Sequence, residues 1–382
     1  MKPKPPRIKP RQKPRQKPND PGWSRNAPPF SEKVFRRLTS KLFWEILKKV
    51  LTFVFRYDNI SMSGEGNEGK PHQLRKDLIF MKTTVSVKYD RRRKYYLVLD
   101  CESATLPCAG NLPADAKKDV AIAKPLIYDL GWKIIDKKGR VYSRKNFLIS
   151  EIFSVPSIFD TAYYASKRPL YLEKLERGEI TLTDWRSASA ELENDMQYVE
   201  AVGAYNSMFD FKKAIPFTEL YINQLYSPDF HDWLRNQNQI CERIANGFGS
   251  SSSKEFDPDV FRFRGKVYPL FDLWGLSCKY IMDNDDYKVT CLQNGWQTES
   301  GKYFKTSAET AYRFASGKLD FDEAHTAIDD ADIESEIFAL IVKKAKNQVE
   351  MGIEYFPFRI LGTVRKFVSQ HPEYADFVDC DF

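Results

Sequence analysis

The sequence predicts an α/β protein with a mixed sheet flanked by helices. Apolar segments of strand length alternate with helix-forming segments between residues 94 and 343. The chain has 382 residues, of which 42% are hydrophobic, so it can bury a sizeable core. These observations exclude a fully disordered chain and place the folded body after a distinct N-terminal region.

Residues 1–30 predict a basic, disordered arm. They repeat Lys-Pro units and contain almost nothing that could be buried, a pattern typical of disorder and polyproline II. Residues 1–57 hold 16 Lys and Arg against 3 Asp and Glu, which leaves a net charge of −6 on the rest of the chain. The arm could tether a polyanion by releasing counterions, or it could be a solvated tail that aids solubility. The candidate tether residues are Lys9, Arg11, Lys13, Arg15 and Lys17.

Residues 31–57 predict a basic amphipathic helix, because apolar residues from Phe35 to Phe53 recur at helical spacing. This helix could pack on the body, bind a partner protein or lie on a membrane surface. Residues 58–78 are Gly-rich and polar and predict a linker. We find no signal peptide and no convincing membrane span, and the six scattered cysteines indicate reduced thiols, so we expect a cytoplasmic protein.

The body begins with segments that predict strands, at 80–89, 94–101, 126–135 and 141–150. Together they predict a three-stranded antiparallel meander. Helices are expected at 158–175 and 188–199, a short buried strand at 201–205, and a flexible loop at 247–259.

Two acidic residues end the most apolar of these segments. Asp100 and Glu102 follow the run 95–99, and on a strand they share one face about 7 Å apart. Neighbouring carboxylates at the end of a buried strand repel each other and lose hydration, which a bound divalent cation offsets. The alternative is a strand that simply runs out into solvent.

The second acidic position is Asp210. The strand at 201–205 is followed by Asn206 and Ser207, either of which can cap a helix, so that Asp210 lies in the first turn near the sheet edge. The alternative is that Asp210 only complements the helix dipole.

The third position opens a long helix. Thr326 and Asp329 fit a capping box, which explains Asp329 structurally. At about 100° per residue, Asp330 lies within the buried apolar stripe, whereas Asp332 faces water. The apolar residues of this stripe are Ile333, Ile337, Leu340 and Ile341. An inward aspartate needs a partner, and a metal shared with the other carboxylates supplies one. His325, just before the cap, can point at the same place, although a lone histidine is more often structural.

These three segments resemble the exonuclease motifs of the DEDDh 3′-to-5′ exonuclease superfamily, which includes RNase T-like enzymes and polymerase III epsilon-type proofreading domains. The motifs fall on Asp100 and Glu102, on Asn206, Phe209 and Asp210, and on His325 and Asp330. The resemblance implies a ribonuclease H-like mixed five-stranded sheet in an exonuclease domain at 79–345. It also implies an insert at about 225–265, which adds a lid or substrate contact, and a C-terminal extension at 346–382. Segment 305–317 is similar to exonucleases of phages and mobile elements, so the cytoplasm would be that of a host.

The activity that the resemblance implies is hydrolysis of single-stranded DNA from its 3′ end, with release of nucleoside monophosphates. Two Mg²⁺ or Mn²⁺ ions would be held by the four acids of the motifs, Asp100, Glu102, Asp210 and Asp330. His325 would be the general base, and Asn206 and Phe209 would contact the substrate. Some aromatic residues, among them Tyr163, Tyr164 or Trp185, could stack on bases. The alternatives are an RNA exonuclease of the RNase T type and a catalytically inactive nucleic-acid-binding or replication scaffold protein. A DNA polymerase or other replication protein is a candidate partner.

Overall fold

The computed structural model describes residues 89–90, 92–107, 114–246 and 257–377. The predicted arm, amphipathic helix and linker, with the five tether residues, lie outside these ranges, as does most of the predicted strand 80–89 and the loop 247–259. The described residues belong to one compact unit. Within them, every helix is too short or too polar to cross a membrane.

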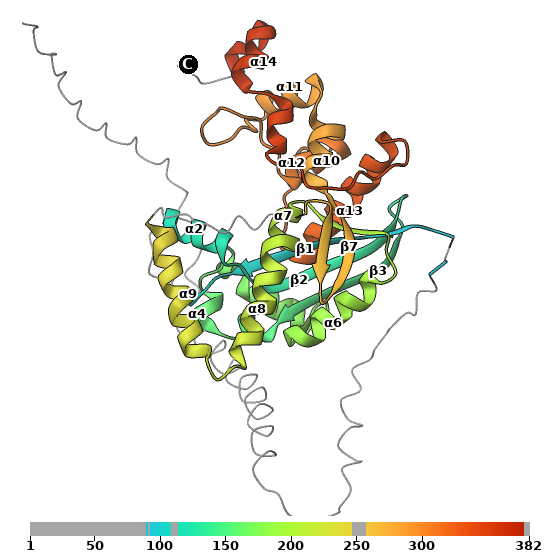
Figure 1. The fold of residues 1–382 in the computed structure, drawn as a ribbon. Coiled ribbons are helices and arrows are strands. Elements are labelled where there is room, and N and C mark those ends of the chain that lie inside the picture. Colours follow the sequence, from blue (N-terminus) through green and yellow to red (C-terminus); the bar gives the residue numbers. More distant parts are fainter. Residues whose placement is uncertain (1–88, 91, 108–113, 247–256, 378–382) are drawn as a thin grey trace, which may run out of the picture. The chain divides into compact units, whose positions relative to one another are not determined.

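A seven-stranded mixed sheet forms the centre of the described fold (Figure 1). Its strand order is β4-β3-β2-β1-β5-β7-β6. β2 is antiparallel to β1 and β3, β6 is antiparallel to β7, and the other neighbours are parallel. The strands are β1 (Tyr95–Ala104), β2 (Leu126–Asp136), β3 (Val141–Ile149), β4 (Thr181–Thr183), β5 (Ala201–Ala204), β6 (Val260–Phe263) and β7 (Lys266–Asp272).

The predicted mixed α/β sheet, its meander β1-β2-β3 and the buried strand β5 are confirmed. The predicted number of five strands is wrong. The sheet gains β4 and β6 at its two edges, and these strands have three and four residues. The four residues of β5 are all buried and form a continuous apolar run, whereas β4 has no buried residue and β6 has two, so neither edge strand forms such a run.

Helices cover both faces of the sheet. The longer ones are α2 (Ala114–Ala123), α5 (Arg168–Glu176), α6 (Trp185–Met196), α8 (Ile215–Leu225), α9 (Phe230–Ala245), α11 (Asp285–Gln293), α12 (Ala308–Ser316) and α13 (Ala327–Lys344). The shorter ones are α3 (Ser150–Phe153), α4 (Pro156–Phe159), α7 (Ser207–Phe209), α10 (Leu273–Ser277) and α14 (Val364–Gln370). The helix predicted at 188–199 corresponds to α6. The helix predicted at 158–175 is divided between α4 and α5, each of which has a proline in its first turn, where proline favours a new start.

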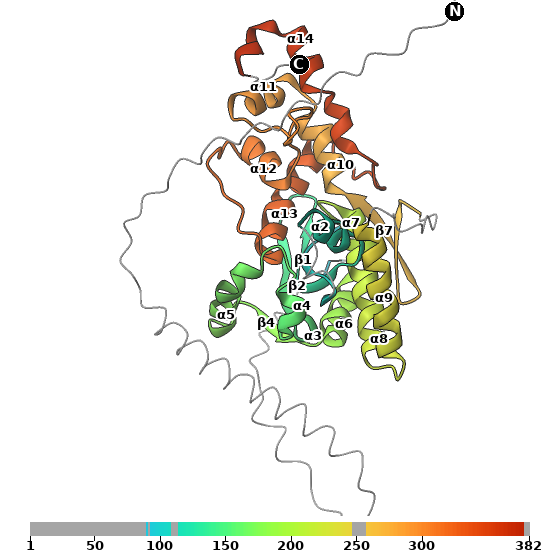
Figure 2. The same cartoon turned by 90° about the vertical axis from the view of Figure 1, so that its left-hand side faces the viewer.

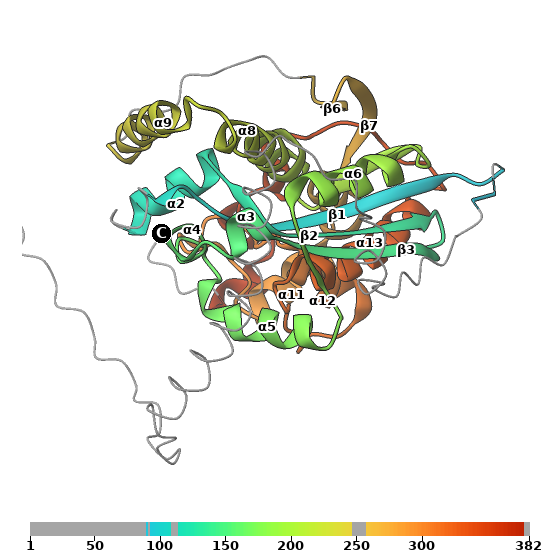
Figure 3. The same cartoon turned by 90° about the horizontal axis from the view of Figure 1, so that it is seen from below.

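Successive side chains of β1 point alternately into two hydrophobic cores, one on each face of the sheet. Leu97 and Leu99 point into a core shared with α6 and α8, whereas Tyr96 and Val98 point into a core shared with α10 to α14. Figure 3 shows α6 and α8 on one side of the sheet and α13 on the other. Because side chains alternate along a strand, the even-numbered Asp100 and Glu102 belong to the α13 side.

A glycine lets α13 approach the sheet at this point. Gly131 on β2 pairs with Asp100, and a Cβ atom added to Gly131 would lie 2.6 Å from the backbone of Ala327 and Ile328. The first turn of α13 therefore rests directly on β2. Figure 2 shows this end of α13 near α5, whose Lys174 Nζ lies 2.6 Å from Asp329 Oδ2.

The start of α13 differs from the predicted capping box. Thr326 is the N-cap residue, but its hydroxyl donates to the Asp329 carboxylate (2.6 Å) and makes no side-chain cap. The backbone N–H of Ala327 instead donates to Asp129 Oδ2 on β2 (2.9 Å). Asp332, which was expected to face water, is half-buried and forms an ion pair with Lys133 at 3.0 Å. That prediction was wrong because the neighbouring strands supply basic partners.

The segment predicted as an insert, 225–265, contains α9 and β6, with residues 247–256 outside the description. The segment predicted as a C-terminal extension contains α14, whose Val364 and Phe367 join the core on the α13 side.

Candidate active site

The two carboxylates of β1 lie in the second half of the strand, on its α13 side. Asp100 and Glu102 are both half-buried, and the pairing of β1 with β2 shifts register directly after Glu102. β5 and β7 run parallel to β1 and end at the same edge of the sheet. From β1 the chain continues into β2, which lies on one side of β1, while β5 lies on the other side. Open α/β sheets often bind ligands at an edge position where neighbouring strands diverge in this way.

Asp330 joins this pair from α13. One carboxylate oxygen from each of Asp100, Glu102 and Asp330 lies within 4.8 Å of the others. Asp330 is 6% exposed, and its Oδ1 has no hydrogen-bond partner among the described residues. A buried, unpaired carboxylate oxygen is costly, so a group that binds there would relieve a real penalty.

Asp210 approaches the same place from the other side of β1. It opens a π-helical turn, Asp210–Ala214, of a kind often found at functional sites. Its Oδ1 accepts a hydrogen bond from the Cys101 thiol at 3.0 Å. It lies outside the three-residue group of Asp100, Glu102 and Asp330. Asn206 is the exposed N-cap of α7, without the predicted side-chain cap, and Phe209 is half-buried.

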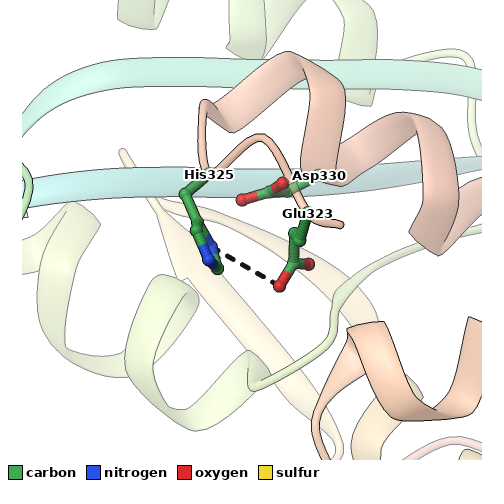
Figure 4. A group of neighbouring side chains, drawn as sticks. All are labelled: Glu323, His325 and Asp330. Carbon is green, nitrogen blue, oxygen red and sulfur yellow. Dashed lines mark ion pairs between the residues drawn. The ribbon is translucent and has the colours of Figure 1, made fainter. Parts of the chain in front are cut away.

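His325 lies in the loop before α13, in the left-handed backbone region with φ of 50°. Its ring stacks on Tyr164, with centroids 4.7 Å apart. Its Nδ1 lies 3.4 Å from Glu323 Oε2, and Figure 4 shows both side chains beside Asp330. Burial, with the nearby Lys167 ammonium, lowers the pKa of His325 from its usual 6.5, so the imidazole is neutral at pH 7 and can accept a proton.

All of these side chains line one pocket of about 270 Å³. Its lining residues are Asp100, Cys101, Glu102, Tyr164, Tyr205, Asn206, Phe209, Asp210, Ala308, Glu323, His325, Asp330 and Glu334. The structure therefore brings together all seven residues that the three motifs predict. No described residue of 225–265 lines this pocket, so the predicted lid stays a prediction.

No protein-family model, curated protein or solved structure matches this chain.

Two acids of the pocket were missed by the sequence analysis. Glu334 is 2% exposed, and one of its oxygens accepts the backbone N–H of Tyr205 at 3.2 Å. It follows Asp330 by four residues, about 40° around the helix, so the same stripe that selected Asp330 could have identified it. Glu323 lies in the loop before α13, where no periodicity indicates direction.

The concentration of carboxylates perturbs their protonation. Burial, together with Glu323 and Asp329, raises the pKa of Asp330 to about 8. Burial raises the pKa of Asp210 to about 7 and that of Glu323 to about 7. Burial and the neighbouring acids also raise the pKa values of Asp100, Glu102 and Glu334 well above their usual range. The positive charge near these carboxylates is too small for all of them to be ionised at once. Divalent cations that bind oxygen ligands, such as Mg²⁺, fit this donor set.

The aromatic residues predicted to stack on bases differ in how exposed they are. Trp185 is 1% exposed within the core, which excludes it as a stacking surface. Tyr164 lines the pocket behind His325. Tyr163 is 89% exposed and contacts Tyr164 edge-on, with centroids 4.8 Å apart.

Proposed function

We propose that this chain is a metal-dependent 3′-to-5′ exonuclease of the DEDDh type that acts on single-stranded DNA. One observation carries the proposal. Oxygens of Asp100, Glu102 and Asp330 lie within 4.8 Å of one another beside His325, and the buried Asp330 Oδ1 has no partner among the described residues. We also propose that β3-β2-β1-β5-β7 is a ribonuclease H-like core and that β4 and β6 are edge additions.

In this proposal Asp100, Glu102 and Asp330 hold divalent Mg²⁺ or Mn²⁺, and Asp210 completes the set from across β1. Bound ions of this kind activate water and stabilise the leaving 3′-oxygen. Asp210 would need to exchange its hydrogen bond with the Cys101 thiol for this role. A thiol is a weak hydrogen-bond donor, so this exchange would give up a weak interaction.

His325 takes the proton of the attacking water. Its neutral imidazole stacks on the ring of Tyr164. A hydrogen bond from Lys167 Nζ to the Ala324 carbonyl (2.6 Å) holds the loop that carries His325. A general base fixed in this way contributes about 10²- to 10⁴-fold. Asn206, exposed at the rim, and Phe209 are proposed to contact the terminal nucleotide.

The test is digestion of a 5′-labelled single-stranded DNA by the full chain with Mg²⁺, with Mn²⁺ and with EDTA. A ladder that shortens from the 3′ end and disappears in EDTA is expected. Absence of cleavage with either ion would overturn the proposal in favour of an inactive nucleic-acid-binding protein. A labelled RNA of the same sequence serves as the second arm, because discrimination depends on contacts to the 2′-hydroxyl. Faster RNA cleavage would assign the RNase T type of activity instead.

A further inference from the structure

The pocket contains a second group of potential metal ligands. One atom from each of Glu323, His325 and Asp330 lies within 4.8 Å of the others. Asp330 belongs to this group and to the group with Asp100 and Glu102, while the other members differ. Figure 4 shows the two carboxylates and the imidazole converging from the loop and the first turn of α13.

The two groups differ in their donor atoms. The group on β1 offers oxygen alone, which suits Mg²⁺. The second group offers one imidazole nitrogen and two carboxylates, and an imidazole nitrogen favours first-row transition ions over Mg²⁺. Ligands at about 2.1 Å from a metal lie roughly 3 to 4 Å from one another, so the separations in this group need only a small contraction.

A purely orienting role for Glu323 explains this geometry less well. Its Oε2 lies 3.4 Å from His325 Nδ1, which is longer than the roughly 2.9 Å of an ordinary N–H···O hydrogen bond. The imidazole is nevertheless held in place by its stack on the ring of Tyr164. In addition, the buried Asp330 Oδ1 points to a missing partner, since it has none in the part of the chain that the structure describes.

We propose that Glu323, His325 and Asp330 bind one divalent first-row transition ion, with Mn²⁺ as the probe, at a position next to the carboxylate group of β1. The inference goes beyond the proposed exonuclease, in which His325 is a base and not a ligand. A neutral imidazole has one unprotonated nitrogen, so an ion bound here would use the lone pair that the proposed base needs. Filling this position would therefore oppose hydrolysis, and its imidazole nitrogen makes Mg²⁺ a less favoured occupant than a transition ion.

The test is pulsed electron paramagnetic resonance of Mn²⁺ added to the full chain, which detects ¹⁴N coupling from a coordinated imidazole. The wild-type chain is expected to show this coupling in the presence of excess Mg²⁺. His325→Gln should abolish it. Glu323→Gln, which leaves the histidine in place, should weaken Mn²⁺ binding at this position at least about tenfold. Asp100→Asn should keep the coupling, because Asp100 belongs only to the other group.

The matched control is His231→Gln, which removes an exposed histidine of α9 and should leave the coupling unchanged. Absence of ¹⁴N coupling in the wild type at saturating Mn²⁺, or coupling that survives His325→Gln, overturns the inference. Unchanged Mn²⁺ affinity in Glu323→Gln overturns it as well. These outcomes are separate from the DNA assay. A chain that shows the coupling but cleaves neither DNA nor RNA loses the exonuclease proposal and keeps the metal site.

Discussion

Two parallel strands of the sheet, β1 and β7, carry acids near the same edge, and these acids differ in how their oxygens are hydrogen-bonded. At the end of β7, Asp272 is 2% exposed, and its two oxygens accept the backbone N–H groups of Ser207 (3.0 Å) and Gly275 (2.9 Å). On β1, Asp100 and Glu102 face Asp330, whose Oδ1 lacks a partner in the described chain.

The comparison shows that burial does not distinguish a structural acid from a candidate ligand. Burial raises the pKa of Asp272 to about 7, close to the value of about 8 for Asp330. Asp129, buried on β2, is likewise satisfied by Asn146 and by the backbone N–H of Ala327. Hydrogen bonding differs where burial does not: Asp272 and Asp129 have donors for both carboxylate oxygens, whereas Asp330 Oδ1 has none in the described chain.

The largest predicted effect comes from substituting one acid on each of these two strands. Asp100→Asn should reduce Mg²⁺-dependent cleavage by about 10³-fold or more, because a bound ion contributes several kcal/mol to the transition state. Asp272→Asn should retain cleavage but lower the free energy of unfolding by about 1 to 3 kcal/mol, since one backbone N–H loses its acceptor. Single-turnover cleavage rates and denaturant titrations measure both. Equal activity of Asp100→Asn and the wild type would erase the distinction between the two strands.

A second prediction concerns the contact that brings Asp330 to β1. Gly131→Ala adds a Cβ atom that would meet the backbone of Ala327 and Ile328 at 2.6 Å. The first turn of α13 must then move away, at a cost of about 1 to 3 kcal/mol, and Asp330 should move with it. We expect a lower melting temperature together with weaker Mg²⁺ activation. Gly178→Ala is a control, because a Cβ atom at Gly178 meets nothing within 4 Å, although its positive φ adds local strain. Wild-type metal activation in Gly131→Ala would show that α13 does not rest on β2 as described.

A third prediction concerns how the stability of the protein depends on pH. The pKa of Asp330 is about 8 in the folded chain, and an unfolded aspartate has a pKa of about 3.9. The folded state therefore binds more protons between about pH 4 and pH 8, and the metal-free protein should lose stability as pH rises through this window. Mg²⁺ or Mn²⁺ should restore it, with a larger gain in melting temperature at pH 8 than at pH 5.

Asp330→Asn should remove most of this metal-induced gain, whereas Asp272→Asn should keep it, although Asp272 contributes to the same pH slope. Thermal unfolding with EDTA and with added ion at both pH values measures the effect. A metal-induced gain that is the same at pH 5 and pH 8 would contradict the role given to Asp330.

The smallest predicted effect is a change in KM when an exposed aromatic residue near the pocket is removed. Tyr163→Ala removes the exposed ring next to Tyr164 and should raise the KM for single-stranded DNA about fivefold, with little change in kcat, because stacking on one base contributes at least about 1 kcal/mol. Tyr226→Ala, an exposed tyrosine that does not line the pocket, is the matched control. Equal KM values for the two variants would place the DNA strand elsewhere.

Much of the site could be predicted from local patterns. The apolar run of β1 and its alternation placed Asp100 and Glu102 on one face, and the helical period of α13 selected Asp330 over Asp329. Both inferences depend on side-chain direction within a single element, which the backbone period fixes. The mixed α/β class followed in the same way, from the order of strand and helix periods.

Other features depended on contacts between elements distant in the chain. The capping-box pattern predicts Thr326 as the cap of α13, but Asp129 on β2 accepts the first N–H of the helix instead. The helical period predicts that Asp332 faces water, but Asp332 pairs with Lys133. The edge strands, the thiol partner of Asp210 and the approach of Glu323 to His325 were not predictable for the same reason. Periodicity tells which face of an element is buried, whereas only the packing of elements decides which side chains meet there and which buried oxygen is left without a donor.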